Sequence, residues 1–212
     1  MDNLKDLAYN YIKQKILTCE LMPGYRLKEK DLMDQINVGR TPVREALLRL
    51  EQENLVKINP RSGTYVKAIE MDAVLELYQL RKIIEPSTAV IIKDKIDSMK
   101  LLDFCDTFKS AEAGIISHQL DTEFHEYIIS CTGNKRLIDF FNTMMESIFR
   151  LDIYNTLQMV NNSQQTTYEE HYAIAQAIIM GDNDLIRKTY IDHINHSQFA
   201  SITALRRQEH DG

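Results

Sequence analysis

The sequence predicts a mainly α-helical chain with one short β-rich stretch in its N-terminal third. Only seven Gly and four Pro occur in 212 residues, which favours long helices over a turn-rich β fold. Apolar residues recur at helical spacing over most of the chain, and β-rich runs are confined to residues 55–69. With 44 % hydrophobic and 26 % charged residues, the chain has enough apolar side chains to bury a core.

The N-terminal part predicts three helices followed by a hairpin. Helices are expected over residues 4–19 and 28–36, and a tight turn separates the second helix from a third. In the third helix we expect Thr41 as N-cap and Pro42 at the first helical position, where a missing N–H costs nothing. β-rich runs on both sides of NPRSG (59–63) predict the hairpin. This order is that of a winged helix-turn-helix.

The remainder of the chain predicts an all-α antiparallel helical bundle. Six helices are expected, at 71–95, 97–115, 118–131, 134–159, 165–180 and 183–206. Their breaks fall at Asp97, at Gly114, at Gly133-Asn134, at the polar run NNSQQTT (161–167) and at Gly181-Asp182. With almost no linker near Ile69, we expect two domains, residues 1–69 and 70–212.

Charge is distributed unevenly between the two parts. Residues 1–70 contain 12 Lys and Arg against 10 Asp and Glu, a balance of +2, and residues 71–212 contain 13 against 21, a balance of −8. Two units with different partners are the simplest interpretation, with the acidic one kept away from polyanions.

The cysteines and the hydropathy pattern indicate a soluble cytoplasmic protein. The three Cys are far apart and form no CxxC pair, which favours reduced thiols. No apolar run has the length of a signal peptide or a membrane span, so we expect no membrane partner.

The third helix carries arginines where a DNA-reading helix needs them. Arg40 and Arg44 lie four residues apart at its N-terminal end and share one side, where arginine suits guanine or phosphate. The free N–H groups of the first turn add an anion site. Arg61 and Gly63 at the hairpin tip suit a wing in the adjacent minor groove. The alternative is a set of solvated arginines on a protein-interaction domain.

The stretch VGRTPVREALLRLEQENLV, together with PRSGTYV, resembles the DNA-binding signature of the GntR family of bacterial transcriptional regulators, over about residues 8–68. The resemblance implies operator DNA contacts from the matching residues Arg40, Thr41, Arg44, Arg49 and Gly63. Two departures are Gly39, where a serine is common, and Asn54, where glycine is usual and where Asn can still adopt the left-handed conformation.

Four ionisable side chains interrupt apolar stripes in the second part: Asp121, His125, His171 and His193. Asp121 and His125 are four residues apart, so both can face one interior point. One carboxylate and three imidazoles form a reasonable ligand set for Zn²⁺, Ni²⁺ or Mn²⁺, with coordination positions left open. The alternative is hydrogen-bonded core histidines and a helix-surface Asp/His pair.

The segments DTEFHEYI, TGNKRLIDFF and EEHYAIAQAIIMGDNDLIRKTYIDHI resemble the FCD ligand-binding domain of FadR-like GntR regulators. Six helices indicate its shorter, VanR-like form. In that domain an aspartate and three histidines commonly hold a divalent metal, and the matching residues are Asp121, His125, His171 and His193. His118 and His196 do not match the motif and are expected at the surface or beside the ligands.

Arg81 lies within an apolar stripe that we expect to comprise Val74, Leu77, Arg81, Ile84, Thr88 and Ile91. A buried arginine needs an anionic partner. That partner is either an internal carboxylate or, as the resemblance implies, an acidic effector.

The predicted function is therefore a ligand-responsive regulator, not an enzyme, which acts as a homodimer on pseudo-palindromic operator DNA, with repression the usual outcome in the family. The alternatives are a metal-dependent hydrolase and a protein-binding winged-helix adaptor.

Overall fold

A computed structural model describes residues 4–211, except for 111–114 and 159–163, and the chain divides into two compact units, residues 1–69 and 70–212. The predicted breaks at Gly114 and at residues 161–163 of the polar run lie outside the described residues. Within the described parts, no helix combines the length and apolar character that crossing a membrane would require.

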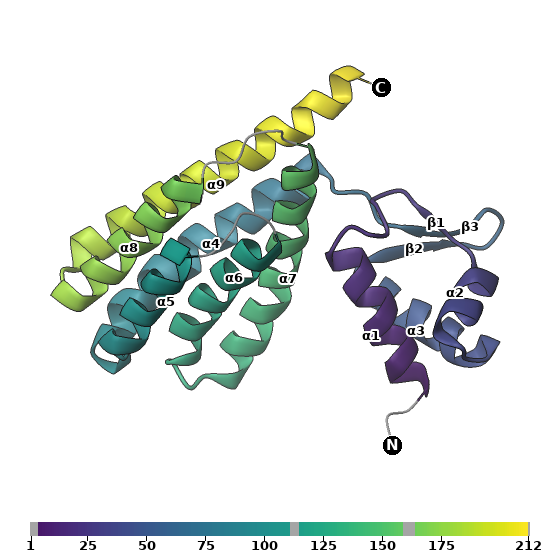
Figure 1. The fold of residues 1–212 in the computed structure, drawn as a ribbon, viewed down its shortest axis with the longest axis horizontal. Helices are drawn as coiled ribbons and strands as arrows, with labels where there is room; N and C mark the ends of the chain where they lie inside the picture. Colours follow the sequence, from purple (N-terminus) through teal and green to yellow (C-terminus); the bar gives the residue numbers. More distant parts are fainter. Residues whose placement is uncertain (1–3, 111–114, 159–163, 212) are drawn as a thin grey trace. The chain divides into compact units, whose positions relative to one another are not determined.

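The first unit has three helices and a small antiparallel sheet (Figure 1). Its elements are α1 (Leu4–Leu17), β1 (Arg26–Leu27), α2 (Glu29–Ile36), α3 (Arg40–Gln52), β2 (Val56–Asn59) and β3 (Gly63–Val66). The predicted helix-helix-turn-helix-hairpin order of a winged helix-turn-helix is therefore confirmed. Asn37 and Asn54 both adopt the left-handed conformation, with φ of 57° and 59°, and they follow α2 and α3.

The core of this unit lies between α1 and α3, which pack along each other. Their fully buried side chains are Ala8, Ile12 and Ile16 from α1 and Val43, Ala46, Leu47 and Leu50 from α3. Both sets recur at helical spacing, which gives each helix one apolar face. The opposite face of α3 is left exposed to solvent, and it carries Arg40 and Arg44.

The sheet contains one strand that the sequence did not predict. Its order is β1-β3-β2, with Ile58 opposite Thr64 in the hairpin and Arg26 opposite Tyr65 on the other edge of β3. β1 is only two residues long, so it carries no alternation that a sequence pattern could reveal. Its pairing with β3 ties the start of α2 to the wing.

The second unit is an all-helical bundle, as predicted (Figure 1). Its helices are α4 (Met71–Ile92), the short 3₁₀ helix η1 (Lys93–Lys95), α5 (Ser98–Ser110), α6 (Ile115–Ser130), α7 (Lys135–Gln158), α8 (Gln164–Met180) and α9 (Asn183–Asp211). α4 packs along α9, α6 along α7, and α8 along both α5 and α9. Helices α6, α8 and α9 thereby bring their inward faces into one core.

The buried stripe of α4 differs from the predicted one. Ile91 was expected inside but is 80 % exposed, and Leu77, Ile84 and Thr88 are only half-buried. The buried side chains are Val74, Tyr78, Arg81, Glu85, Pro86, Ala89 and Ile92. The predicted set followed a strict seven-residue repeat, from which a straight helix drifts by about 20° per heptad. Over 22 residues this drift amounts to about 60°, which turns the predicted stripe away from the core toward its C-terminal end, where Glu85 falls inside and Ile91 outside.

Candidate nucleic-acid interface and candidate metal centre

Helix α3 begins two residues earlier than its sequence suggests. We expected Thr41 as N-cap, but α3 begins at Arg40, and Gly39 is the N-cap, with φ −74° and ψ 176° and no side-chain cap hydrogen bond. Pro42 is therefore the third helical residue instead of the first. This position is tolerated because none of the first N–H groups of a helix has an intrahelical acceptor. Without a capping side chain, these N–H groups are available to an anion.

Arg40, Thr41 and Arg44 are exposed at this end of α3, and both arginines are held by one carboxylate from α2. The Nε of Arg40 donates to Oε2 of Glu29 at 2.8 Å, and the Nε of Arg44 donates to Oε1 at 2.9 Å. The Arg40 hydrogen bond, followed by that of Arg44, lowers the pKa of Glu29. Glu29 thus positions the two guanidinium groups side by side.

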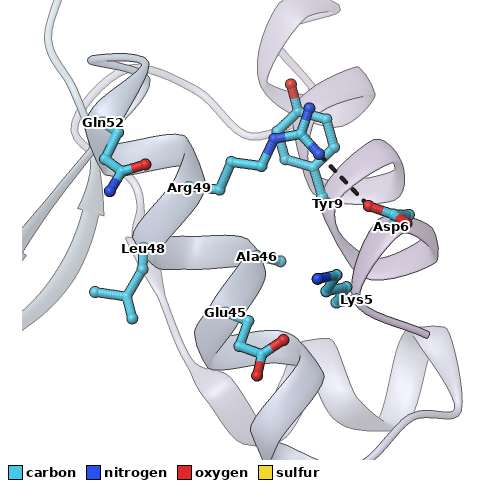
Figure 2. A pocket seen from close by; sticks show the side chains of 8 residues that line it. All are labelled: Lys5, Asp6, Tyr9, Glu45, Ala46, Leu48, Arg49 and Gln52. Atoms are coloured by element: carbon cyan, nitrogen blue, oxygen red, sulfur yellow. Dashed lines mark ion pairs between the residues drawn. The ribbon is translucent and has the colours of Figure 1, made fainter. Parts of the chain in front are cut away.

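Arg49 points away from these two arginines and lies against α1. Its guanidinium lies 3.5 Å from the centre of the Tyr9 ring and pairs with Asp6 at 3.5 Å and with Glu53 at 3.3 Å. Figure 2 shows Arg49 over the Tyr9 ring, in a hollow of about 420 Å³ between α1 and α3. Arg49 is half exposed, and its contacts tie the two helices of the core together.

The wing presents one cation and one constrained glycine. Arg61 is exposed and makes no ion pair with any residue that the structure describes. Gly63 begins β3 with φ +114°, and a Cβ there would lie 3.1 Å from Nε of Arg26. Gly63 therefore has a structural reason to be glycine, because residues with a side chain rarely adopt its positive φ; the exposed Arg26 side chain would have to move by only a few tenths of an ångström.

In the second unit, Asp121 and His125 from α6, His171 from α8 and His193 from α9 come together in the core. Each is at most 9 % exposed, and one potential ligand atom from each lies within 4.8 Å of all the others. Nε2 of His171 is 3.0 Å from Oδ1 of Asp121, and Nε2 of His125 is 3.2 Å from Nε2 of His193. In a tetrahedral Zn²⁺ site, ligand atoms about 2.0–2.1 Å from the ion lie about 3.3 Å from one another. The pairs at 3.0 and 3.2 Å already match this spacing, and any separation near the 4.8 Å limit would have to close by about 1.5 Å for all four side chains to hold one ion.

The protonation states of this cluster suit a cation. Burial lowers the pKa of His193 to about 4, so its imidazole is neutral at pH 7 and keeps a lone pair. Burial alone would raise the pKa of Asp121, but the hydrogen bond from His171 and the neighbouring imidazoles hold it well below its usual value. An ionised carboxylate and a neutral imidazole are the forms in which these groups bind metals.

Arg81 is 1 % exposed, and its anionic partner within the chain is Glu85, one helical turn further along α4. The guanidinium contacts Glu85 through Nε at 2.5 Å and through Nη2 at 3.4 Å. Nη2 also lies 3.4 Å from Nε2 of His125. Of the two partners expected for Arg81, the structure contains the internal carboxylate, directly beside the metal-ligand cluster.

Comparison with known proteins identifies both units. The model for bacterial regulatory proteins of the gntR family matches residues 4–66, and the model for the FCD domain matches residues 76–196. The chain belongs to the GntR family. It is a DNA-binding transcription regulator with a winged helix-turn-helix and an FCD domain of the FadR-like branch.

Relatives and solved structures agree with this assignment. The chain is 25 % identical to the HTH-type transcriptional regulator YdhC of Bacillus subtilis (strain 168) over 195 residues, covering 89 % of this chain and 86 % of YdhC. It is 24 % identical to the HTH-type transcriptional repressor RspR of Escherichia coli (strain K12) over 209 residues, covering 96 % and 90 %.

Two solved structures share the fold. A GntR transcriptional regulator from Rhodococcus sp. RHA1 superposes with a TM-score of 0.79 at 18 % identity, covering 94 % of this chain and 98 % of that one. The Zn²⁺-bound FCD domain of TM0439 superposes with a TM-score of 0.53 at 20 % identity, covering 65 % and 97 %. At these identities the similarity shows the fold alone.

Two carboxylates of the FCD domain complete the cluster, and the sequence pattern did not single them out. Oε2 of Glu85 lies 2.8 Å from Nδ1 of His125, and Oε2 of Glu170 lies 2.9 Å from Nδ1 of His193. The other oxygen of Glu170 contacts the exposed His196, which was expected at the surface or beside the ligands. The only sequence signals were that Glu85 is four residues after a buried arginine and that Glu170 precedes a candidate ligand.

Proposed function

We propose that this GntR regulator is a ligand-responsive repressor that acts as a cytoplasmic homodimer, and that its FCD domain binds a divalent metal and a small carboxylate effector. The observation that carries the proposal is the convergence of one buried carboxylate and three buried imidazoles from α6, α8 and α9. Repression is supported by the similarity to a relative that is named a transcriptional repressor. In this proposal residues 1–69 bind DNA, and residues 70–212 bind the effector and dimerise.

Operator recognition is assigned to the exposed start of α3 and to the wing. We assign base or phosphate contacts to exposed or half-exposed residues of these two elements: Arg40, Thr41, Arg44, Arg49, Arg61 and Gly63. Arg49 has to leave its contacts with Tyr9 and Asp6 to reach a phosphate, so its contribution is the smallest of the arginines. Since one recognition helix reads only a few base pairs, a two-fold dimer on a pseudo-palindromic site supplies the remaining contacts.

The metal ligands are assigned to Asp121, His125, His171 and His193. The donor set is one carboxylate oxygen and three imidazole nitrogens, which suits Zn²⁺, Ni²⁺ or Mn²⁺. The Zn²⁺-bound FCD domain of TM0439, which shares the fold, supports the assignment. When bound, such an ion supplies positive charge and open positions for a carboxylate oxygen.

Arg81 is assigned as the second anchor for the effector carboxylate. Its Nε and Nη2 are used by Glu85 and His125, whereas Nη1 makes no hydrogen bond to the residues that the structure describes. An arginine has five N–H donors, so one edge of the guanidinium is left for a second carboxylate. Effector binding then changes the relative placement of the two winged domains in the dimer, and with it the operator affinity.

The metal assignment is tested by elemental analysis of untagged full-length protein purified without chelator. We compare wild type with His171→Ala and with the control His118→Ala, whose imidazole lies outside the cluster and contacts Thr156. About one Zn, Ni or Mn per chain is expected in wild type and control, and none in His171→Ala. No metal in any sample, even after it is added back, would remove the metal from the proposal.

The DNA assignment is tested separately, by selecting bound sequences from random duplex DNA. A pseudo-palindromic consensus is expected, with affinity that falls steeply as salt increases because bound counterions are released. Affinity that is independent of sequence and salt would argue against operator reading by α3.

A further inference from the structure

Two carboxylates lie directly behind two of the candidate metal ligands. Glu85 on α4 faces Nδ1 of His125 at 2.8 Å, and Glu170 on α8 faces Nδ1 of His193 at 2.9 Å. Glu85 is 1 % exposed, and the side chain of Glu170 is 18 % exposed. The two contacts come from different helices, yet each meets the same ring nitrogen of its histidine. The positions of the two carboxylates therefore bear on which nitrogen of each imidazole carries the hydrogen.

An ionised carboxylate only accepts hydrogen bonds, so Nδ1 of His193, which is hydrogen-bonded to Glu170, has to carry a hydrogen. At His125 the Glu85 oxygen lies equally close to Nδ1 but outside hydrogen-bond alignment, and its negative charge favours a hydrogen on that nitrogen. In a neutral imidazole with Nδ1–H, the other nitrogen, Nε2, has a lone pair. The Nε2 atoms of His125 and His193 face each other at 3.2 Å. Two lone pairs at this distance repel each other unless a positive centre lies beside them, and Nη2 of Arg81, 3.4 Å from Nε2 of His125, supplies part of that positive charge. The carboxylates thus direct two donor atoms toward one point in the cluster.

The two carboxylates are themselves held in place. Glu85 receives Nε–H of Arg81 on its other oxygen, which fixes the plane of the carboxylate. Glu170 contacts the exposed His196 through its other oxygen. Each carboxylate therefore uses one oxygen for a ligand histidine and the other for a second partner, which limits its freedom to rotate.

We propose that Glu85 and Glu170 are positioning residues that hold His125 and His193 in the Nδ1–H tautomer, so that both Nε2 lone pairs are directed at the metal. This inference rests on the proposed metal site but concerns different residues. Carboxylates that orient metal-bound histidines in this way typically contribute 10- to 100-fold to metal affinity. Of the two, Glu170 allows the cleaner test, because removing Glu85 also leaves Arg81 buried without its anion.

The experiment uses full-length protein in which histidine is labelled with ¹⁵N. We compare wild type with Glu170→Ala, Glu170→Gln, His196→Ala and Glu169→Ala; the last removes an adjacent exposed carboxylate of the same helix. Long-range ¹H–¹⁵N spectra of the chelator-stripped protein at pH 7 identify the tautomer of each buried histidine. Competition with a chromophoric chelator then measures Zn²⁺ affinity, and thermal unfolding shows that each stripped variant is folded.

We expect His193 to be Nδ1–H in wild type and to lose this preference in Glu170→Ala, together with a loss in Zn²⁺ affinity of about 10- to 100-fold. Glu170→Gln keeps an acceptor oxygen and should retain the tautomer with a smaller affinity loss. Glu169→Ala should match wild type in both measurements, and His196→Ala, which frees the other oxygen of Glu170, should retain the tautomer and lose less Zn²⁺ affinity than Glu170→Ala. If Glu170→Ala does not fold, a Zn²⁺ affinity of Glu170→Gln equal to that of wild type overturns the inference.

Wild-type tautomer and wild-type Zn²⁺ affinity in a folded Glu170→Ala would also overturn the inference while leaving the metal site intact. A wild type that binds no Zn²⁺ would instead refute the proposed metal site. In that case the tautomers of the stripped proteins still decide whether Glu170 positions His193.

Discussion

The buried Arg81–Glu85 pair gives the sharpest prediction about the stability of the bundle. Both side chains are 1 % exposed and lie one turn apart on α4. We consider Arg81→Met, which keeps an unbranched side chain but removes the cation. The variant leaves the Glu85 carboxylate buried, with His125 as its remaining neighbour. Removing one partner of a buried ion pair typically destabilises a protein by about 3–5 kcal/mol.

The pKa of Glu85 supports this magnitude independently. Burial alone would raise it, but the charge of Arg81, followed by the interaction with His125, lowers the pKa from 4.5 to about 2. A change of this size corresponds to about 3 kcal/mol. Because the folded-state pKa is depressed, this stabilisation is present above the unfolded-state value near 4.5 and is lost as the pH falls toward 2.

The assay is thermal unfolding of chelator-stripped protein at pH 7, followed by circular dichroism. Arg81→Met should lower the unfolding temperature of the bundle by about 8–15 °C. The double variant Arg81→Met/Glu85→Gln removes both charges and should recover roughly 2 kcal/mol of the loss, because neighbouring residues are energetically coupled. The control Lys82→Met removes a cation from the next residue, which is half-buried and bonds Gln198, and should cost less than about 1 kcal/mol. An Arg81→Met variant as stable as wild type would refute the reasoning.

Three further predictions concern the helix, the wing and the bundle surface. Arg44→Ala should weaken operator binding by about 1–3 kcal/mol and relax the preference at one base position per half-site, as measured by gel shift on a selected site. Gly63→Ala should destabilise the first unit by roughly 1–3 kcal/mol in thermal unfolding, because φ is +114° and the new Cβ approaches Arg26. Burial, followed by the charge of Glu146, raises the pKa of Glu126 to about 7, so its stabilising contribution is present below pH 4.5 and is lost as the pH rises through 7. Glu126→Gln should therefore stabilise the protein at pH 8 by roughly 1 kcal/mol after allowance for solvent screening, and much less at pH 5.

Each of these has its own control. An Arg44→Ala protein with unchanged affinity and sequence preference would count against its contact with bases. Gly39→Ala is the match for Gly63→Ala, because Gly39 has φ −74° and open space around its Cβ position, and equal effects of the two would contradict the strain argument. For Glu126→Gln, the same gain at pH 5 as at pH 8 would show that ionisation is not the cause.

The order of elements in the first unit could be predicted because each element carries its own local signal. Helical spacing of apolar residues identified α1 and α3, and the turn residues NPRSG identified the hairpin. The N-cap of α3 was predicted two residues too late, since Thr41 is a good capping residue by type but the chain enters the helix at Gly39. β1 was missed, because a two-residue strand exists only through its partner β3.

In the second unit, the same local signal gave six helices but not the position of every buried face. The i, i+4 spacing alone shows that Asp121 and His125 share one side of a helix. His171 and His193 could be singled out because they interrupt apolar stripes, but nothing in the spacing places them beside Asp121 and His125, and the resemblance to a family supported the common metal site. The packing of α8 along α9 is what brings these residues together.

The sequence by itself therefore determined the helices, the hairpin and the need of Arg81 for an anion, because propensity, periodicity and the cost of an unpaired buried charge act along the chain. Only the tertiary structure decided the partners of the buried polar groups. In the folded bundle Arg81 pairs with Glu85, and Nε2 of His125 lies next to Nε2 of His193. Glu170 contacts Nδ1 on the other side of the His193 ring. The physical reason is that hydrogen bonds between helices act over about 3 Å, and packing alone brings residues from separate helices that close.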